Sequence, residues 1–333
     1  MSETLIEVRN VSKVFTSGFI KKSRLVAVND VSLSILAGEP QIITVAGESG
    51  SGKTTLAQMI LGFHQPSSGE ILYEGTKIQD LRPEQFVEFR KRVQAIFQNP
   101  FDAFNPFYPV DHALLKPIEW LRLAMNRQGA DLMIDDALGE VRLDPAQTLG
   151  RYPHQLSGGQ LQRTMIARAL LLKPKLIVAD EPVSMIDVSL RAIILDILVQ
   201  LKEKFGISLL YITHDLSTAL QISDRIMIMY HGSVVEQGET ASVIQNPRHP
   251  YTQLLVNSIP MPDPEKKWGP MPSAASKEDR QTGESRGCIF QQRCPHQMPV
   301  CSEYHPPRFN IHPTHQAACF LYQEGSDESS WRT

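Results

Sequence analysis

Short apolar runs of strand length alternate with longer segments of helical spacing along most of the chain. Apolar and β-branched residues fill the runs 41–46, 176–179 and 208–213, which is typical of strands buried on both faces. Residues 31–35 alternate with period two instead, so this strand is expected to have one buried and one wetter face. Helical spacing follows the buried strands, and the pattern therefore predicts an α/β domain.

The remaining periodic segments add further strands and a helical region. Residues 5–11 are expected to form an edge strand, and residues 225–230 and 233–237 two more strands around a turn. From residue 82 to about 156 the spacing is mostly helical with proline breaks. This stretch predicts a helical insertion over about 82–170.

Composition narrows the class of protein. The chain has 333 residues, of which 42% are apolar and 21% charged, as in soluble globular proteins. A formal net charge of -3 gives no sign of a polyanion-binding surface, so no nucleic acid partner is expected. No apolar run approaches the length of about 18 residues that a membrane span needs. The N-terminus lacks a basic region followed by an apolar core, and we expect a cytosolic chain.

Residues 47–55 fit the phosphate-loop pattern G-x-x-x-x-G-K-[ST]. A strand-like run precedes them and a helix-favouring run follows, so the glycines fall at a strand-to-helix turn rather than in a chance Gly/Ser-rich turn. In such a loop the backbone N–H groups converge on phosphate oxygens, Lys53 reaches the β and γ phosphates, and the Thr54 hydroxyl ligates Mg²⁺. The nucleotide-binding residues expected here are Gly47, Glu48, Ser49, Gly50, Ser51, Gly52, Lys53, Thr54 and Thr55.

Two buried strands deliver polar residues at their carboxyl ends. The run 176–179 leads into Asp180 and Glu181, and the run 208–213 leads into His214. In a phosphate-loop enzyme, an acid in the place of Asp180 holds Mg²⁺, and the next carboxylate orients and deprotonates water. Open α/β sheets bind ligands at this edge, so we expect His214 to contact the γ-phosphate rather than to be structural.

A further helix start is predicted at Ser157. Ser157 followed three residues later by Gln160 is a capping-box pattern, and a helical face continues through Met165. The exposed backbone donors of this helix start make a second candidate anion site. An ordinary capped helix would give the same pattern.

In this order, these motifs resemble those of ABC-transporter ATP-binding subunits. The discriminating feature is the signature Leu-Ser-Gly-Gly-Gln at residues 156–160, because phosphate loops are shared by many other NTPases. The resemblance spans residues 5–245 and includes Gln98 and Asp187. It implies an ATP-binding domain over 1–245, with an α/β phosphate-loop NTPase core, an N-terminal antiparallel β subdomain and the helical insertion.

The resemblance also implies an ATP sandwich of two such domains paired head to tail. The catalytic residues so implied are Glu181, His214, Gln98 and Lys53. Gln98 would join Thr54 and Asp180 at Mg²⁺. Contacts with the nucleotide would further come from Phe15, stacked on adenine, and from Ser157, Gly158, Gly159, Gln160 and Asp187, with Ser157 and Gly159 reaching the ATP of the partner domain.

Finer motifs resemble the oligopeptide/dipeptide-uptake subfamily. They are Phe97-Gln98-Asn99-Pro100, Asn105-Pro106, Tyr152-Pro153-His154-Gln155 and residues 246–252. The resemblance implies an extension of this type over 246–333. Within it, the Pro- and Ser-rich stretch of about 259–286 is expected to be an extended linker, followed by a cysteine cluster over 288–319.

The four cysteines follow the pattern C-x5-C-x6-C-x17-C. In a reducing compartment, a local cysteine cluster indicates a metal or redox site rather than disulfides. No C-x-x-C pair signals a zinc ribbon, and four thiolates suit an iron–sulfur cluster or zinc equally. The tails that this one resembles hold a [4Fe-4S] cluster, which implies that cofactor on Cys288, Cys294, Cys301 and Cys319. Zinc is the second choice and free buried thiols the third.

The function implied is an ATPase subunit that powers an importer, most directly of oligopeptides or dipeptides, at the cytoplasmic face of the cell membrane. Its partners would be a second ABC ATPase subunit, favoured as a sister chain over a second copy, two integral-membrane permease subunits and, indirectly, an extracytoplasmic solute-binding protein. The sequence Ser184-Met185-Ile186-Asp187, where Ser-Ala-Leu-Asp is usual, keeps an oligosaccharide importer open.

Two other classes of function compete with the transporter. A soluble ABC ATPase acting on nucleic acid is disfavoured by the slightly acidic balance and by the single nucleotide domain. A binding module that has lost hydrolysis is disfavoured because Glu181 and His214 are both present.

Overall fold

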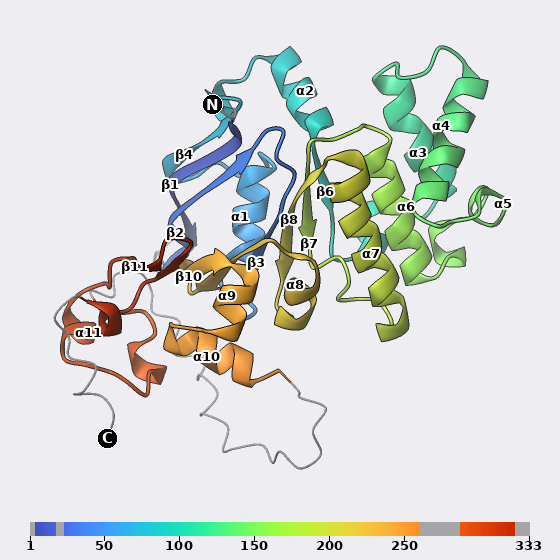
Figure 1. The fold of residues 1–333 in the computed structure, drawn as a ribbon. Helices are drawn as coiled ribbons and strands as arrows, with labels where there is room; N and C mark the ends of the chain where they lie inside the picture. The colour runs from blue at the N-terminus through green and yellow to red at the C-terminus, as the bar shows by residue number, and fades with distance from the viewer. Residues whose placement is uncertain (1–3, 18–22, 260–286, 324–333) are drawn as a thin grey trace. The chain divides into compact units, whose positions relative to one another are not determined.

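The computed structural model describes residues 4–17, 23–259 and 287–323 (Figure 1). The predicted linker therefore lies outside the described residues from 260 onward. The chain divides into two compact units. Unit 1 comprises Met1–Ile6, Ser34–Ile42 and Leu72–Ile212, and unit 2 comprises Glu7–Leu33, Ile43–Ile71 and Thr213–Thr333.

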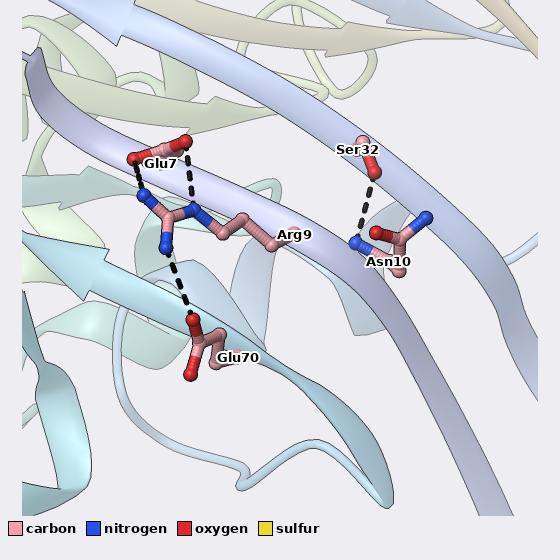
Figure 2. A network of polar contacts seen from close by, with 5 residues as sticks. All are labelled: Glu7, Arg9, Asn10, Ser32 and Glu70. Atoms are coloured by element: carbon pink, nitrogen blue, oxygen red, sulfur yellow. Dashed lines mark hydrogen bonds and ion pairs between the residues drawn. The ribbon is translucent and has the colours of Figure 1, made fainter.

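In unit 2, three strands of an N-terminal sheet lie in the order β2, β1, β4. β1 (Thr4–Ser17) and β2 (Ser23–Leu36) extend beyond the predicted runs, and β4 is Ser68–Tyr73. Arg9 on β1 joins Glu7 of its own strand and Glu70 of β4, and the Asn10 N–H donates to Ser32 Oγ of β2 at 2.9 Å (Figure 2). These exposed contacts fix register more than they add stability.

The second sheet region of unit 2 contains the strand before the phosphate loop. β3 (Ile42–Ala46) pairs in parallel with β9 (Arg225–Tyr230), and β9 pairs antiparallel with β10 (Ser233–Glu239). The C-terminal segment folds back onto β10 through β12, with β11 outermost, as Figure 1 shows in red. The predicted strands 225–230 and 233–237 are confirmed. The other elements of unit 2 are α1 (Lys53–Ile60), α8 (Leu216–Ile222), α9 (Thr240–Gln245), α10 (Pro250–Asn257), η5 (Gln291–Arg293), α11 (Val300–Glu303), β11 (Phe309–His312), β12 (His315–Ala317) and η6 (Phe320–Tyr322).

One apolar cluster in unit 2 joins the nucleotide-binding part of the chain to the C-terminal segment. Ala46 of β3 and Tyr251 of α10 belong to it, together with Phe290, Met298 and Phe320 from beyond residue 287. Tyr251 and Phe290 are almost fully buried and their ring centroids lie 5.5 Å apart. The C-terminal segment is therefore part of the core of this unit.

In unit 1, three parallel strands lie side by side (Figure 1). β7 (Leu176–Asp180) lies between β6 (Val93–Ile96) and β8 (Ser208–Thr213). β4 also pairs antiparallel with the short β5 (Thr76–Lys77). The helices of unit 1 are η1 (Ile78–Asp80), α2 (Pro83–Arg92), η2 (Pro100–Ala103), α3 (Val110–Trp120), α4 (Arg127–Glu140), α5 (Pro145–Thr148), η3 (Pro153–Gln155), α6 (Gly158–Leu170) and α7 (Val188–Phe205).

Strand β6 interrupts the segment that the sequence pattern predicts as mostly helical. Its four residues, Val-Gln-Ala-Ile, are too few to show a strand period beside the helical spacing of α2. Pairing with β7 buries Val93 and Ile96, and this tertiary contact decides the conformation. In the described part of the chain, no helix is long and apolar enough to span a bilayer.

Candidate nucleotide site

The phosphate loop connects β3 to α1, as the sequence predicts. Gly47 and Gly52 have φ values of 152° and 100°, and a Cβ at either would lie 2.1 Å from a backbone oxygen, that of Met229 or Ala27. Only glycine fits these two positions. A Cβ at Gly50 would meet nothing within 4 Å, so the loop backbone is open to a ligand there.

Lys53 lies over this loop at the start of α1. Its side chain is buried, and Nζ donates to Gly47 O at 2.8 Å and to Glu48 O at 2.9 Å. Thr54, next to it, is exposed. The ammonium and the first N–H groups of α1 therefore surround the same loop, which is the donor set that binds nucleotide phosphates. The donor set fits ATP, with the Thr54 hydroxyl available for Mg²⁺.

Two side chains from the C-terminal part of unit 2 hold Glu48 of the loop. The Glu48 N–H donates to the hydroxyl of the buried Tyr251 at 2.9 Å, and its carboxylate is paired with Arg293. Sequence reasoning missed both contacts. Arg293 and Glu48 are 245 positions apart, and no local pattern relates them.

In unit 1, the expected catalytic carboxylate lies at the end of β7. Gln98 Nε2 donates to Glu181 Oε2 at 3.0 Å, so the structure brings these two predicted residues together. The Glu181 N–H donates to Ile212 O at 2.9 Å, and the residue has a left-handed φ of 44°. Asp180 is the last residue of β7 and is half-buried.

The signature segment forms the predicted helix start. Ser157 Oγ accepts from the Gln160 N–H at 3.2 Å, and Gln160 Oε1 accepts from the Ser157 N–H at 2.9 Å, which confirms the capping box. Gly158 begins α6. A Cβ at Gly159 would lie 2.9 Å from Leu190 Cδ1, so this close approach to α7 excludes larger residues. Ser157 itself is exposed.

Three further predicted site residues are exposed at the ends of elements. In unit 2, His214 follows β8, and Phe15 lies near the end of β1 with its ring 5.8 Å from that of His64. Asp187 is the N-cap of α7 in unit 1. The side chains of all three residues are thus in contact with solvent.

The four cysteines of the C-terminal segment are free thiols that gather in one region. Cys288, Cys301 and Cys319 are buried and Cys294 is half-buried beside the same apolar cluster. Burial raises the pKa of the Cys288 thiol to about 11 and that of Cys319 to about 12, and the neighbouring thiols add to both rises. The four thiols therefore lie close enough together to influence one another electrostatically.

The arrangement of these thiols differs from the expected metal centre. Among residues 4–17, 23–259 and 287–323, no group of three or more His, Cys, Asp or Glu side chains is arranged to hold a metal ion. The expectation of a [4Fe-4S] cluster, or of zinc, is thus not supported by the geometry. The thiols match the cluster in number and chemistry only.

The glycine-rich loop with its lysine, the carboxylate at the end of a parallel strand and the capped Leu-Ser-Gly-Gly-Gln helix define a phosphate-loop ATPase of the ABC type. Two family models match the chain: "ABC transporter" over residues 28–184 and "Oligopeptide/dipeptide transporter, C-terminal region" over residues 235–301. Solved structures agree: the ATP-binding cassette MJ0796, bound to ADP and Pi, has a TM-score of 0.63 at 27% identity and covers 71% of this chain and 98% of its own.

Relatives of similar length extend the match to the whole chain. The putative oligopeptide transport ATP-binding protein YkfD of Bacillus subtilis is 38% identical over 98% of this chain and 98% of its own length. The oligopeptide transport ATP-binding protein OppF of Escherichia coli is also 38% identical, over 85% of this chain and 84% of its own. The chain belongs to the family of ABC-transporter ATP-binding subunits of the oligopeptide/dipeptide type.

Proposed function

We propose that this chain is the ATP-hydrolysing subunit that powers an importer of oligopeptides or dipeptides. The observation that carries the proposal is the joint presence of the phosphate loop, the Gln98–Glu181 pair and a C-terminal region that matches the oligopeptide/dipeptide model. The relatives named above are themselves described as oligopeptide transport proteins. The subunit works at the cytoplasmic face of the membrane with two permease subunits and a solute-binding protein.

Each candidate residue has a defined task in hydrolysis. Lys53 would bind the β and γ phosphates, and Thr54, Gln98 and Asp180 would supply the ligands of Mg²⁺. Mg²⁺ neutralises charge on the phosphates when bound. Glu181, oriented by Gln98, takes the proton of the attacking water, and His214 contacts the γ-phosphate.

The site is completed by another ATPase domain. Ser157 and Gly159 lie at the start of α6, a helix N-terminus that is suited to an anion, and we propose that they serve the ATP bound by the partner domain. Asp187 and Phe15 add contacts at the rim and at the adenine. We assign the partner as a sister subunit rather than a second copy of this chain.

Transport of peptides is tested in cells that lack this chain. Restoring the wild-type chain is expected to restore uptake of a labelled tripeptide, whereas Glu181→Gln restores none at equal expression. Restored uptake of a labelled oligosaccharide instead of the peptide would overturn the peptide assignment and favour the alternative importer. The absence of a co-purified permease, together with tight polynucleotide binding, would contradict the transporter role altogether.

The gathering of four thiols supports a second proposal, that the C-terminal segment holds a [4Fe-4S] cluster on Cys288, Cys294, Cys301 and Cys319. Coordination to iron would convert the thiols to thiolates with release of their protons, and this would offset the rise in thiol pKa that burial causes. The cluster would link the four cysteines and so stabilise the fold of the C-terminal segment. Zinc is the alternative occupant.

Metal content of the anaerobically purified full-length chain tests this second proposal. Iron and acid-labile sulfide are expected in equal amounts, lost in Cys288→Ser and retained in the control His305→Gln, which changes an exposed neighbour. A sample that contains zinc but no iron would show that zinc, and not the cluster, occupies the cysteines. If neither metal is found, the cysteines are buried thiols and the proposal is wrong.

A further inference from the structure

The C-terminal segment, residues 287–323, contacts the phosphate loop through the side chain of Arg293. Arg293, the last residue of η5, donates from Nη2 to Glu48 Oε1 at 3.0 Å and from Nη1 to Glu48 Oε2 at 3.1 Å. Two parallel bonds between a guanidinium and a carboxylate fix orientation as well as distance. The Arg293 side chain is only 15% exposed, against 39% for that of Glu48, so water screens the pair only in part.

Arg293 is itself held firmly in place. Its guanidinium lies 5.7 Å from the ring centroids of both Tyr230 and Phe290, and Nη1 also donates to the Tyr230 hydroxyl at 3.4 Å. The turn that carries it is tied at its start, where the Cys288 N–H donates to Cys301 O at 2.7 Å. A guanidinium held in this way has few alternative positions. The position of the turn that carries Arg293 therefore determines where the Glu48 carboxylate is held.

A second contact holds the backbone of the same loop residue. The Glu48 N–H donates to the hydroxyl of Tyr251, while Lys53 Nζ donates to the Glu48 carbonyl at 2.9 Å. Bound phosphates would take over Lys53 and release that carbonyl. The contacts from Tyr251 and Arg293 do not involve the lysine, and they continue to hold Glu48 when Lys53 turns to the nucleotide.

We propose that Arg293 is a positioning residue for ATP: acting through Glu48, with Tyr251, it keeps the phosphate loop in the shape that receives phosphates. The C-terminal segment thereby sets the nucleotide affinity of the chain. The inference rests on the ATPase activity in the proposed function and not on the transported solute. The inference therefore still holds if the chain does not transport peptides. Uptake assays test the peptide assignment, whereas nucleotide titrations test the role of Arg293.

The expected consequence is a change in binding more than in chemistry. A loop without this support must be ordered by the nucleotide itself, and that ordering weakens affinity. On this proposal, Arg293 has a role in the shape of the phosphate loop and none in activating water. Its loss should therefore raise the Kd and the KM for ATP and change kcat little.

A double-mutant cycle on the full-length chain tests the proposal. Titration of a fluorescent ATP analogue and steady-state hydrolysis are compared for Arg293→Met, which keeps an apolar stem over the two rings, for Glu48→Gln and for both together. Each single variant is expected to raise Kd and KM by about tenfold with kcat within about twofold, and the double variant by no more than either single one. Arg293→Lys, which retains charge but not the two-point fork, should fall between.

Arg308→Ala is the matched control. Arg308 lies exposed in the same segment and donates to the backbone oxygen of Asp30, away from Glu48, so its loss should leave Kd, KM and kcat unchanged. If the increases in Kd of the two single variants multiply in the double variant, the two residues act independently and the proposal is overturned. A Kd for Arg293→Met equal to that of the control would overturn it too. If Arg293→Met does not fold, Tyr251→Phe decides: it removes only the hydroxyl, and an unchanged Kd would overturn the clamp on Glu48.

Discussion

Glu181 combines an uncommon backbone conformation with a side chain held by an amide. Its φ of 44° lies in the left-handed region, which costs energy for a residue with a side chain. The neighbours keep it there, because its N–H donates to Ile212 O and its carbonyl accepts from Ser184 Oγ at 3.0 Å. Backbone strain of this kind is found mostly at functional sites, and it agrees with the proposed role of Glu181 as the base.

Glu181→Gln is expected to lower kcat for ATP hydrolysis by at least about 100-fold, the usual contribution of a general base. The amide keeps the size of the side chain but accepts no proton, so the Kd for ATP should stay close to that of the wild type. Single-turnover hydrolysis and nucleotide titration measure the two quantities. Glu203→Gln, an exposed carboxylate on α7, is the control, and equal rates for both variants would show that the base lies elsewhere.

The candidate site residues were proposed from local motifs, each of which depends on a short stretch of chain. The glycines of the loop and the carboxylate after β7 follow from their flanking strands. The support of Glu48 by Tyr251 and Arg293 was not predictable in this way. Tyr251 lies in the stretch 246–252, which the sequence relates only to the uptake subfamily, and only the folded core shows that its hydroxyl accepts a hydrogen bond from the loop.

At the scale of elements, the start of α6 has to serve both as a cap and as a candidate ATP contact. Ser157→Ala should lower the free energy of unfolding by about 1 kcal/mol through loss of the cap. We expect it also to reduce hydrolysis in the assembled complex by more than tenfold, an expectation drawn from the loss of an anion contact worth about 1.4 kcal/mol or more. Thermal unfolding and ATPase assays separate the two effects.

Asn126→Ala provides the matched comparison for Ser157→Ala. Asn126 caps α4 by accepting from the Gly129 N–H at 2.8 Å and belongs to no candidate site. A similar loss of stability with normal hydrolysis is expected. If both variants hydrolyse ATP at the same rate, Ser157 is only a helix cap.

The start of α10 depends on a histidine that burial keeps neutral. His249 Nδ1 accepts from the Tyr251 N–H at 3.1 Å, while the Glu236 carboxylate accepts from the backbone N–H of His249 at 2.8 Å. Phe290 covers the ring at a centroid distance of 5.7 Å. Burial lowers the pKa of His249 from 6.5 to about 3, so the folded chain does not take up a proton there.

This depressed pKa predicts acid sensitivity with a definite sign. Below about pH 6.5 the unfolded chain binds a proton at this histidine and the folded chain does not, so the free energy of unfolding falls as pH is lowered toward 3. The slope from this one group is at most about 1.4 kcal/mol per pH unit. Denaturant unfolding of His249→Asn between pH 6.5 and 5 should show a smaller slope than wild type. His154→Asn, at an exposed ring, is the control, and equal slopes for all three chains would contradict the assignment.

Elements with strong periodicity were predictable, and those fixed by distant contacts were not. The buried runs before the phosphate loop and before Asp180 are strands β3 and β7. Strand β6 was hidden, because its four residues follow directly on the helical spacing of α2 and gain their conformation by pairing with β7. When the sequence signal of an element is short, tertiary contacts determine its conformation.

At the scale of the whole molecule, the C-terminal segment is not an appendage to the nucleotide-binding part. β12 extends the sheet of unit 2 at β10, and Phe290 lies within 6 Å of Tyr230, Tyr251 and His249 by ring centroids. Stability of the core and position of Arg293 therefore depend on the same packing. Loss of that packing should affect both properties together.

Phe290→Ala tests this link at its centre. Truncation of a phenylalanine that is 1% exposed should lower the free energy of unfolding by about 3 kcal/mol or more. Because Phe290 also stacks on Arg293, the folded fraction should bind ATP more weakly, in the same direction as Arg293→Met. Calorimetry and nucleotide titration on the same sample measure both effects. Phe107→Ala, at a phenylalanine that is 83% exposed, should change neither. A destabilised Phe290→Ala chain with wild-type ATP affinity would show that the core supports the segment without governing the phosphate loop.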